Sequence, residues 1–183
     1  MFNKFELIGA SASIFFMGLA LYLVQVNNIM FSDGPAGHSA QAIQSQESGI
    51  VIVGQSANVN QARTDAYLKA SDEQGNINRM VVDDVKIGTG EAVKEGDTVA
   101  VHYIGTLQNG KEFDNSRKRG APFEFKVGEG RVIKGWDEGL VGMQVGGQRM
   151  LVIPPDMAYG EQGVGPIPGN STLVFAIELM EIK

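Results

Sequence analysis

The two histidines are the natural candidates for acid–base chemistry, and neither has the partners that such chemistry needs. His38 lies in a stretch rich in Gln, Ser, Asn, Ala and Gly. His102 lies in a strand-like segment, where alternation places it on the opposite face from Tyr103. A single strand histidine is more often a surface or structural residue than a functional one. The sequence therefore indicates no Ser/His/Asp catalytic set.

Phosphate, thiolate and metal chemistry also lack their usual signals. No glycine-rich loop opens a helix after a strand, and the GEG at 128–130 lacks the required spacing. The chain has no cysteine, which excludes a cysteine nucleophile and a thiolate zinc site, and its carboxylates show no metal-ligand pattern. The formal net charge is −6 without a basic run, which argues against nucleic-acid binding. We expect no metal and no cofactor.

Aromatic residues and prolines near turns are the remaining candidates, and they are concentrated in four segments. These segments are VHYIGTLQNGKEFDNS (101–116), APFEFKVGEGRVIKGWDEGL (121–140), IPPDMAYGEQG (153–163) and IPGNSTLVFAIELMEI (167–182). Taken singly, an aromatic such as Trp136 or Phe175 fits an ordinary core position, and Tyr103 or Tyr159 fits a buried residue with a bonded hydroxyl. Asp114 with the two residues after it also fits a simple turn.

Taken together and in this order, the four segments resemble the FKBP family of peptidyl-prolyl cis/trans isomerases over about residues 79–183. The resemblance implies an α+β fold in which a bent antiparallel sheet wraps around one short helix. It implies a pocket for proline-containing polypeptides, and macrolide inhibitors as further ligands. The implied catalytic residues are Tyr103, Phe113, Asp114, Tyr159 and Phe175. The implied substrate-binding residues are Phe123, Val132, Ile133, Trp136 and Ile167.

The resemblance also implies individual roles. Trp136 would form the floor of the pocket. The backbone N–H of Ile133 and the hydroxyl of Tyr159 would donate hydrogen bonds to substrate carbonyls. Asp114 would lie at the rim, held by Arg119.

Such a pocket suits a reaction in which no covalent bond changes. Rotation about an X–Pro bond has a barrier of about 18–20 kcal/mol, which comes from amide resonance. The twisted transition state has lost this resonance, so its carbonyl is less polar than that of the planar ground state. An apolar pocket therefore favours the twisted form over the planar one.

The elements that must position these residues follow from local patterns. Strand-like stretches recur between turn signals at residues 80–87, 98–107, 123–127, 148–153 and 172–182. In the last stretch, one face carries Leu173, Phe175, Ile177 and Leu179. The sequence Gln108-Asn109-Gly110 predicts a hairpin turn, and the spacing of Ile133, Trp136 and Leu140 predicts a helix over 132–141. The pattern alone thus favours an antiparallel sheet packed on one helix.

The N-terminal segment, residues 1–31, predicts a membrane anchor. No charged residue occurs between Leu7 and Ser32, and a helix over residues 7–26 would span about 30 Å, the thickness of the bilayer's hydrocarbon layer. The alternative is a signal peptide, whose apolar region is typically ~7–15 residues long and ends in a small-residue cleavage site. Lys4 precedes the run and the next basic residue is Arg63, which favours a cytoplasmic N-terminus and an extracytoplasmic isomerase domain. The alternative localisation is secretion after cleavage.

Residues 32–78 predict a flexible tether between the anchor and the domain at 79–183. The segment is rich in polar and small residues and contains neither Trp nor Phe, so it offers little apolar surface to bury. Residues 50–53 fit a short strand and residues 59–71 fit one or two helical turns.

Two functions other than an active isomerase remain open at this level. One is a binding module that keeps the fold without activity, and the other is a membrane-tethered chaperone. The presence of Tyr103, Asp114, Trp136 and Tyr159 favours the enzyme, because a scaffold has no need of the whole pocket set.

Overall fold

The computed structural model describes residues 49–53 and 59–183. The predicted membrane anchor at 1–31, with its helix at 7–26, and residues 32–48 and 54–58 of the predicted tether lie outside these residues. Among the helices within the described ranges, none is long and apolar enough to cross a membrane.

The described residues form a seven-stranded sheet with the order β1-β2-β6-β7-β3-β4, in which β5 also pairs with β3. All neighbouring strands are antiparallel except β1 and β2, which run parallel. The strands are β1 Ile50–Ile52, β2 Met80–Lys86, β3 Thr98–Leu107, β4 Glu112–Asn115, β5 Phe123–Lys126, β6 Gln148–Ile153 and β7 Leu173–Ile182. The five predicted strands are therefore present, each within a residue or so of its expected bounds.

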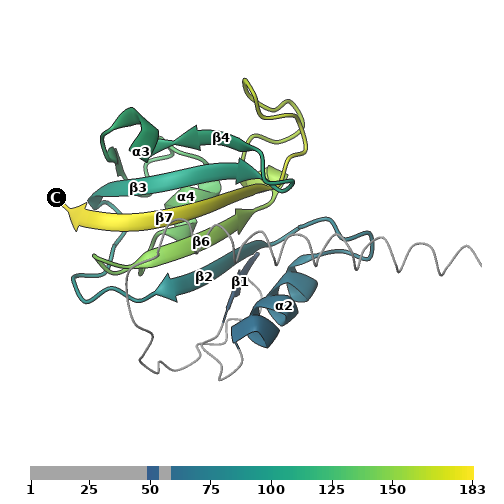
Figure 1. Cartoon of the computed structure of the whole chain (residues 1–183), viewed down its shortest axis with the longest axis horizontal. Coiled ribbons are helices and arrows are strands. Elements are labelled where there is room, and N and C mark those ends of the chain that lie inside the picture. Colours follow the sequence, from purple (N-terminus) through teal and green to yellow (C-terminus); the bar gives the residue numbers. More distant parts are fainter. Residues whose placement is uncertain (1–48, 54–58) are drawn as a thin grey trace, which may run out of the picture.

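Short helices accompany the sheet on different sides. In Figure 1, α4 lies behind β3 and β7, whereas α2 lies beside β1 and β2, away from α3 and β4. The helices are α2 Val59–Ala70, α3 Ser116–Arg119 and α4 Lys134–Gly139, with a 3₁₀ turn, η1, at Pro155–Met157. The single helix that we predicted over 132–141 is α4, and it is shorter because Ile133 has an extended backbone.

The main core lies between the sheet and α4, and strand alternation decides which residues enter it. In β3, Val99, Val101 and Tyr103 are all buried in this core. The predicted alternation in β7 is confirmed, since its odd-numbered apolar residues lie in the main core while Val174 lies in a second cluster on the other side. Trp136 of α4 and Leu140, the C-cap residue that follows this helix, are buried in the main core.

The strand β4 is absent from our sequence prediction. It follows the predicted hairpin turn, where Gly110 has the positive φ of 85° that glycine adopts most readily. Three of its four residues are Glu112, Asp114 and Asn115, which strands do not favour. Pairing with β3 imposes the strand, and it places Phe113 and Asp114 beside the main core.

A second core on the outer face of the sheet corrects the prediction of a flexible tether for the part of residues 32–78 that the structure describes, where the short strand and the helical turns that we expected are present. Tyr67 and Ala70 of α2, with Val53, are buried against outward-facing apolar residues of three strands, namely Val81, Met150, Val152 and Val174. Arg63 of α2 also pairs with the buried Asp83 of β2 at 2.6 Å. In the part of the segment that the structure describes, β1 and α2 therefore pack onto the domain.

Candidate functional site

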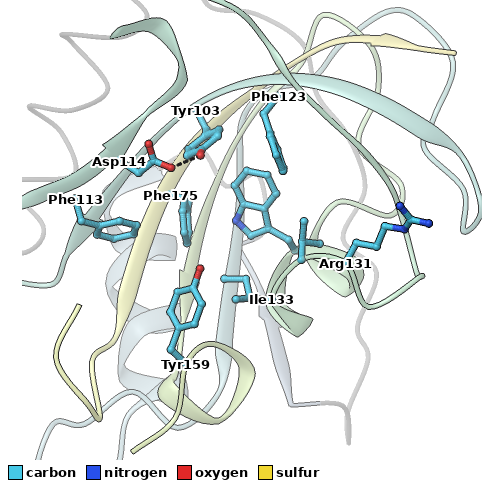
Figure 2. Close-up of a pocket in the computed structure, with 10 residues that line it drawn as sticks. Tyr103, Phe113, Asp114, Phe123, Arg131, Ile133, Tyr159 and Phe175 are labelled. Atoms are coloured by element: carbon cyan, nitrogen blue, oxygen red, sulfur yellow. Dashed lines mark hydrogen bonds between the residues drawn. The ribbon is translucent and has the colours of Figure 1, made fainter. Parts of the chain in front are cut away.

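A pocket opens at one end of the main core, between the sheet and the start of α4. Figure 2 shows its side chains converging from strands and loops that are distant in the sequence. Its lining consists of Tyr103, Phe113, Asp114, Phe123, Arg131, Val132, Ile133, Trp136, Tyr159 and Phe175.

Nine of the ten predicted site residues line this pocket. The exception is Ile167, which is buried in the main core and is not among the lining residues. Burial does not by itself set Ile167 apart, because Tyr103, Trp136 and Phe175 are buried in the same core and do line the pocket. The structure adds Arg131, whose guanidinium points away from the pocket centre in Figure 2 and pairs with Glu129 at 3.0 Å.

Edge-to-face contacts fix the aromatic walls. The Tyr103 and Trp136 ring centroids lie 4.9 Å apart with an angle of 89° between the ring planes, and Trp136 and Phe175 lie 5.2 Å apart at 80°. Phe113 meets Phe175 at 5.6 Å. Such contacts stabilise aromatic pairs beyond the area that they bury. These contacts hold the rings of the wall against one another.

The close approach of Phe113 to Phe175 depends on a glycine in β3. A Cβ atom on Gly105 would lie 2.7 Å from Cζ of Phe113 and 2.9 Å from Cε1 of Phe175, which is closer than carbon atoms tolerate. A side chain here would displace one of the two rings, so Gly105 leaves the space that the two rings occupy.

A network of hydrogen bonds and one ion pair lies at the rim of the pocket. The Tyr103 hydroxyl donates to Oδ2 of Asp114, and the Arg119 guanidinium pairs with Oδ1 of the same carboxylate. Nη2 of Arg119 also donates to the Tyr103 oxygen at 2.9 Å, and its Cζ lies 5.3 Å from the centroid of the Tyr103 ring. The predicted rim position of Asp114 and its contact with Arg119 are thus confirmed.

The comparison with known proteins agrees with this geometry. Residues 89–180 match the family model described as FKBP-type peptidyl-prolyl cis-trans isomerase. The chain belongs to the FKBP family.

Curated relatives and solved structures show how far the likeness extends. The chain is 60% identical over 90 residues to FK506-binding protein 2 of Emericella nidulans, which covers 49% of this chain and 67% of that protein. It is 56% identical over 107 residues to FK506-binding protein 4 of Gibberella zeae, which covers 58% of this chain but only 21% of the relative. The chain thus spans about a fifth of the length of that relative.

Two solved structures also match. The crystal structure of FkpA from Escherichia coli has a TM-score of 0.54 and 53% identity, covering 57% of this chain and 48% of FkpA. The crystal structure of AtFKBP13 has a TM-score of 0.55 and 38% identity, covering 62% of this chain and 98% of AtFKBP13.

Within this FKBP domain, the pocket hydroxyls keep their protons at neutral pH. Burial and the hydrogen bond to Asp114 raise the pKa of Tyr103 from 10.0 to about 12. Since the unfolded chain loses this proton at lower pH than the folded chain, the resulting stabilisation is complete below about pH 10 and is lost as the pH rises toward 12. Burial also raises the pKa of Tyr159, with the Asp114 charge as a further cause. Both residues are hydroxyl donors under physiological conditions.

Two donors of the FKBP domain are placed for the roles that the resemblance implied. Figure 2 shows the Tyr159 hydroxyl directed into the space bounded by Phe113, Phe175 and Ile133. Ile133 is the N-cap of α4, and N–H groups at the start of a helix have no acceptor within that helix. The geometry is compatible with donation to a substrate carbonyl from both groups, and the roles themselves stay predictions.

His102 lies outside the site, as the strand alternation predicted. Its Nδ1 is 3.0 Å from the hydroxyl of Ser116, which is fully buried. The same hydroxyl accepts a hydrogen bond from the backbone N–H of Tyr103 at 2.8 Å. No local sequence pattern distinguishes Ser116, because its role comes from the contact between β3 and α3. Ser116 thus supports the backbone of Tyr103, whereas the His102 ring contacts the Ser116 hydroxyl.

Proposed function

We propose that this chain is a peptidyl-prolyl cis/trans isomerase that accelerates X–Pro rotation in polypeptide substrates. The observation that carries the proposal is the pocket itself, an aromatic cavity with one fixed polar network at its rim. The alternative of an inactive binding module does not explain why Tyr103, Asp114 and Arg119 are tied together where a substrate would enter.

The geometry suggests how the pocket would act. The prolyl ring would rest on Trp136 between Tyr103, Phe113 and Phe175, while the preceding residue lies toward the rim. This environment favours the less polar, twisted carbonyl over the planar amide, because the rotation takes place away from bulk water. The N–H of Ile133 and the Tyr159 hydroxyl would hold the flanking carbonyls, so that only the X–Pro bond turns. No group gains or loses a proton in this scheme.

A protease-coupled assay with a chromogenic proline tetrapeptide tests the proposal on the full chain. We expect acceleration over the uncatalysed rate, and a decrease in kcat/KM on the order of tenfold or more for Phe113→Ala, because the substrate ring loses a wall that orients it. Met180→Ala is the control, since Met180 is 44% exposed on β7 and does not line the pocket. No acceleration by the wild type, or equal rates for both variants, would contradict the proposal.

The names of the relatives, FK506-binding protein 2 and FK506-binding protein 4, say that those proteins bind FK506. We extend this ligand class to the present pocket, since its lining is apolar and aromatic. Inhibition of the assay above by FK506 would place the macrolide in the same pocket as the peptide.

We also propose that the N-terminal run anchors the isomerase domain to a membrane. Support comes from the absence of charged residues between Leu7 and Ser32, and Lys4 before this run favours an extracytoplasmic domain. Deleting residues 7–26 should move the protein from the membrane fraction to the soluble fraction, because the run is the only long apolar stretch in the sequence. If the deletion variant still sedimented with membranes after alkaline washing, the anchor would lie elsewhere.

A further inference from the structure

Helix α4, which carries Trp136 at the pocket floor, has a sequence that favours a helix only weakly. Its six residues, KGWDEG, include two glycines, each of which disfavours a helix interior by about 1 kcal/mol relative to alanine. Its N-cap, Ile133, makes no side-chain capping hydrogen bond. A helix this short is not stable alone, so tertiary contacts must fix the position of α4.

The two glycines bring α4 into unusually close contact with β6. A Cβ on Gly135 would lie 2.5 Å from Cγ2 of Ile153, and one on Gly139 would lie 2.9 Å from Cδ1 of Leu151. These contacts set how near the helix lies to the sheet. They are apolar and non-directional, so they constrain sliding along the sheet less than a hydrogen bond would.

A buried arginine of β6 supplies directional contacts at the other end of α4. Arg149 is only 6% exposed, and its Nη1 donates to the carbonyl of Gly139 at 2.7 Å and to that of Val141 at 3.1 Å. Its Nε and Nη2 donate to the two carboxylate oxygens of Asp84 in β2, at 2.7 and 2.9 Å. A single planar guanidinium thus joins the C-terminal end of α4 to two strands.

Charge and geometry both favour this arrangement. The carbonyls at the C-terminal end of a helix lack partners within the helix and carry partial negative charge, so a cation there is stabilising. Asp84 balances the buried positive charge and, through its two-point contact, fixes the plane of the guanidinium. Arg149 does not line the pocket, so any effect on the site is indirect, and α4 is the pocket-bearing element to which its guanidinium donates hydrogen bonds.

We propose that Arg149 is a positioning residue for the isomerase site, which holds α4 so that Trp136 forms the pocket floor at the correct depth. The proposal rests on the isomerase function proposed above. In this proposal, an ion pair that does not line the pocket determines where the floor of the pocket lies.

The chain offers a matched control in a second buried ion pair. Asp83 and Asp84 are neighbours in β2, but Asp83 pairs with Arg63 of α2 on the outer face, whereas Asp84 pairs with Arg149. Asp83 is 5% exposed, so breaking its pair also leaves a buried charge without its partner. Removing either arginine costs stability, but only Arg149 makes hydrogen bonds to the C-terminal end of α4.

The test compares Arg149→Met, Arg149→Lys and Arg63→Met in the full chain, at a temperature where each is folded. Trp136 is the single tryptophan, so fluorescence emission and acrylamide quenching report on the pocket floor alone. The kinetic readout is kcat and KM for the chromogenic proline tetrapeptide, and thermal unfolding midpoints measure stability.

We expect Arg149→Met to shift the emission of Trp136, to increase its quenching, and to lower kcat/KM on the order of tenfold or more, since small misplacements in a site have large kinetic effects. Arg149→Lys should lie between the wild type and Arg149→Met in both Trp136 fluorescence and kcat/KM. Lysine keeps the positive charge but lacks the planar guanidinium. Arg63→Met should lower the unfolding midpoint and leave fluorescence and kcat/KM as in the wild type.

Unchanged Trp136 fluorescence and kcat/KM in Arg149→Met would overturn the proposal, as would equal changes in Arg63→Met. If Arg149→Met has no cooperative unfolding transition, the comparison of Arg149→Lys with Arg63→Met decides by the same criteria. An inactive wild type would contradict the proposed function, and the fluorescence comparison would still decide whether Arg149 positions Trp136.

Discussion

Asp114→Leu is expected to lower kcat/KM on the order of tenfold to a hundredfold, while stability falls by only about 1 kcal/mol. Asp114 accepts a hydrogen bond from the Tyr103 hydroxyl and forms an ion pair with Arg119. One carboxylate therefore fixes two groups at the pocket rim. Leucine has a similar size but accepts no hydrogen bond, and both partners are then free to move. The fold is affected less, because Asp114 is 38% exposed and lies on the short strand β4.

Two further variants separate the possible causes of this effect. Tyr103→Phe removes the hydroxyl but keeps the ring that packs on Trp136, so it should have a smaller effect than Asp114→Leu. His102→Ala removes a side chain on the outer face and should leave kcat/KM near the wild-type value. Steady-state kinetics on the tetrapeptide, with unfolding midpoints as the stability control, measure all three. A His102 variant that lost activity while Asp114→Leu kept it would mean that the site lies on the other face of the sheet.

Removing residues 49–78 is expected to lower the free energy of unfolding by several kcal/mol without abolishing the fold. The buried residues of the main core all come from residue 80 onward, so residues 79–183 retain a complete core. The deletion uncovers Val81, Met150, Val152 and Val174, and burying each such side chain fully is worth about 1.5–3 kcal/mol. The shorter fragment should therefore unfold cooperatively at a lower temperature and bind an apolar dye.

Fragments 49–183 and 79–183 provide the comparison, since both lack the predicted membrane segment. Two point variants in the longer fragment refine it. Tyr67→Ala, at a residue 5% exposed on α2, should cost about 3–5 kcal/mol, whereas Leu68→Ala, at a residue 56% exposed, should cost little. Equal unfolding midpoints for the two fragments would show that the second core adds nothing. A broad transition in fragment 79–183 would show instead that α2 and β1 are required for the fold.

The second core illustrates what local sequence did and did not reveal. Composition alone made residues 59–70 resemble a linker, because the helix offers only small residues and Tyr67 for burial. The informative signal was on the partner strands. Residues 150–153 of β6 form an unbroken apolar run, which is typical of a strand covered on both faces. That pattern predicts a cover on the outer face, although it does not say which segment provides it.

The sequence by itself determined the parts of this protein that depend on short-range periodicity and on motif order. Strand alternation predicted Tyr103 inside and His102 outside, the Asn-Gly sequence predicted the turn that follows β3, and the ordered motifs named nine residues that line one pocket. These features follow from pleating, turn chemistry and residue type, which act between near neighbours in the chain.

Only the tertiary structure decided the features that depend on contacts between distant segments. It imposed β4 on a polar sequence by pairing with β3, and it placed α2 against the outer face. It also brought Arg149 to the end of α4, 10 residues away along the chain, and to Asp84, 65 residues away. The physical reason is that burial and hydrogen bonding are satisfied by whichever groups the fold brings together. The sequence around a charged residue such as Arg149 does not indicate which partners it will contact in the fold.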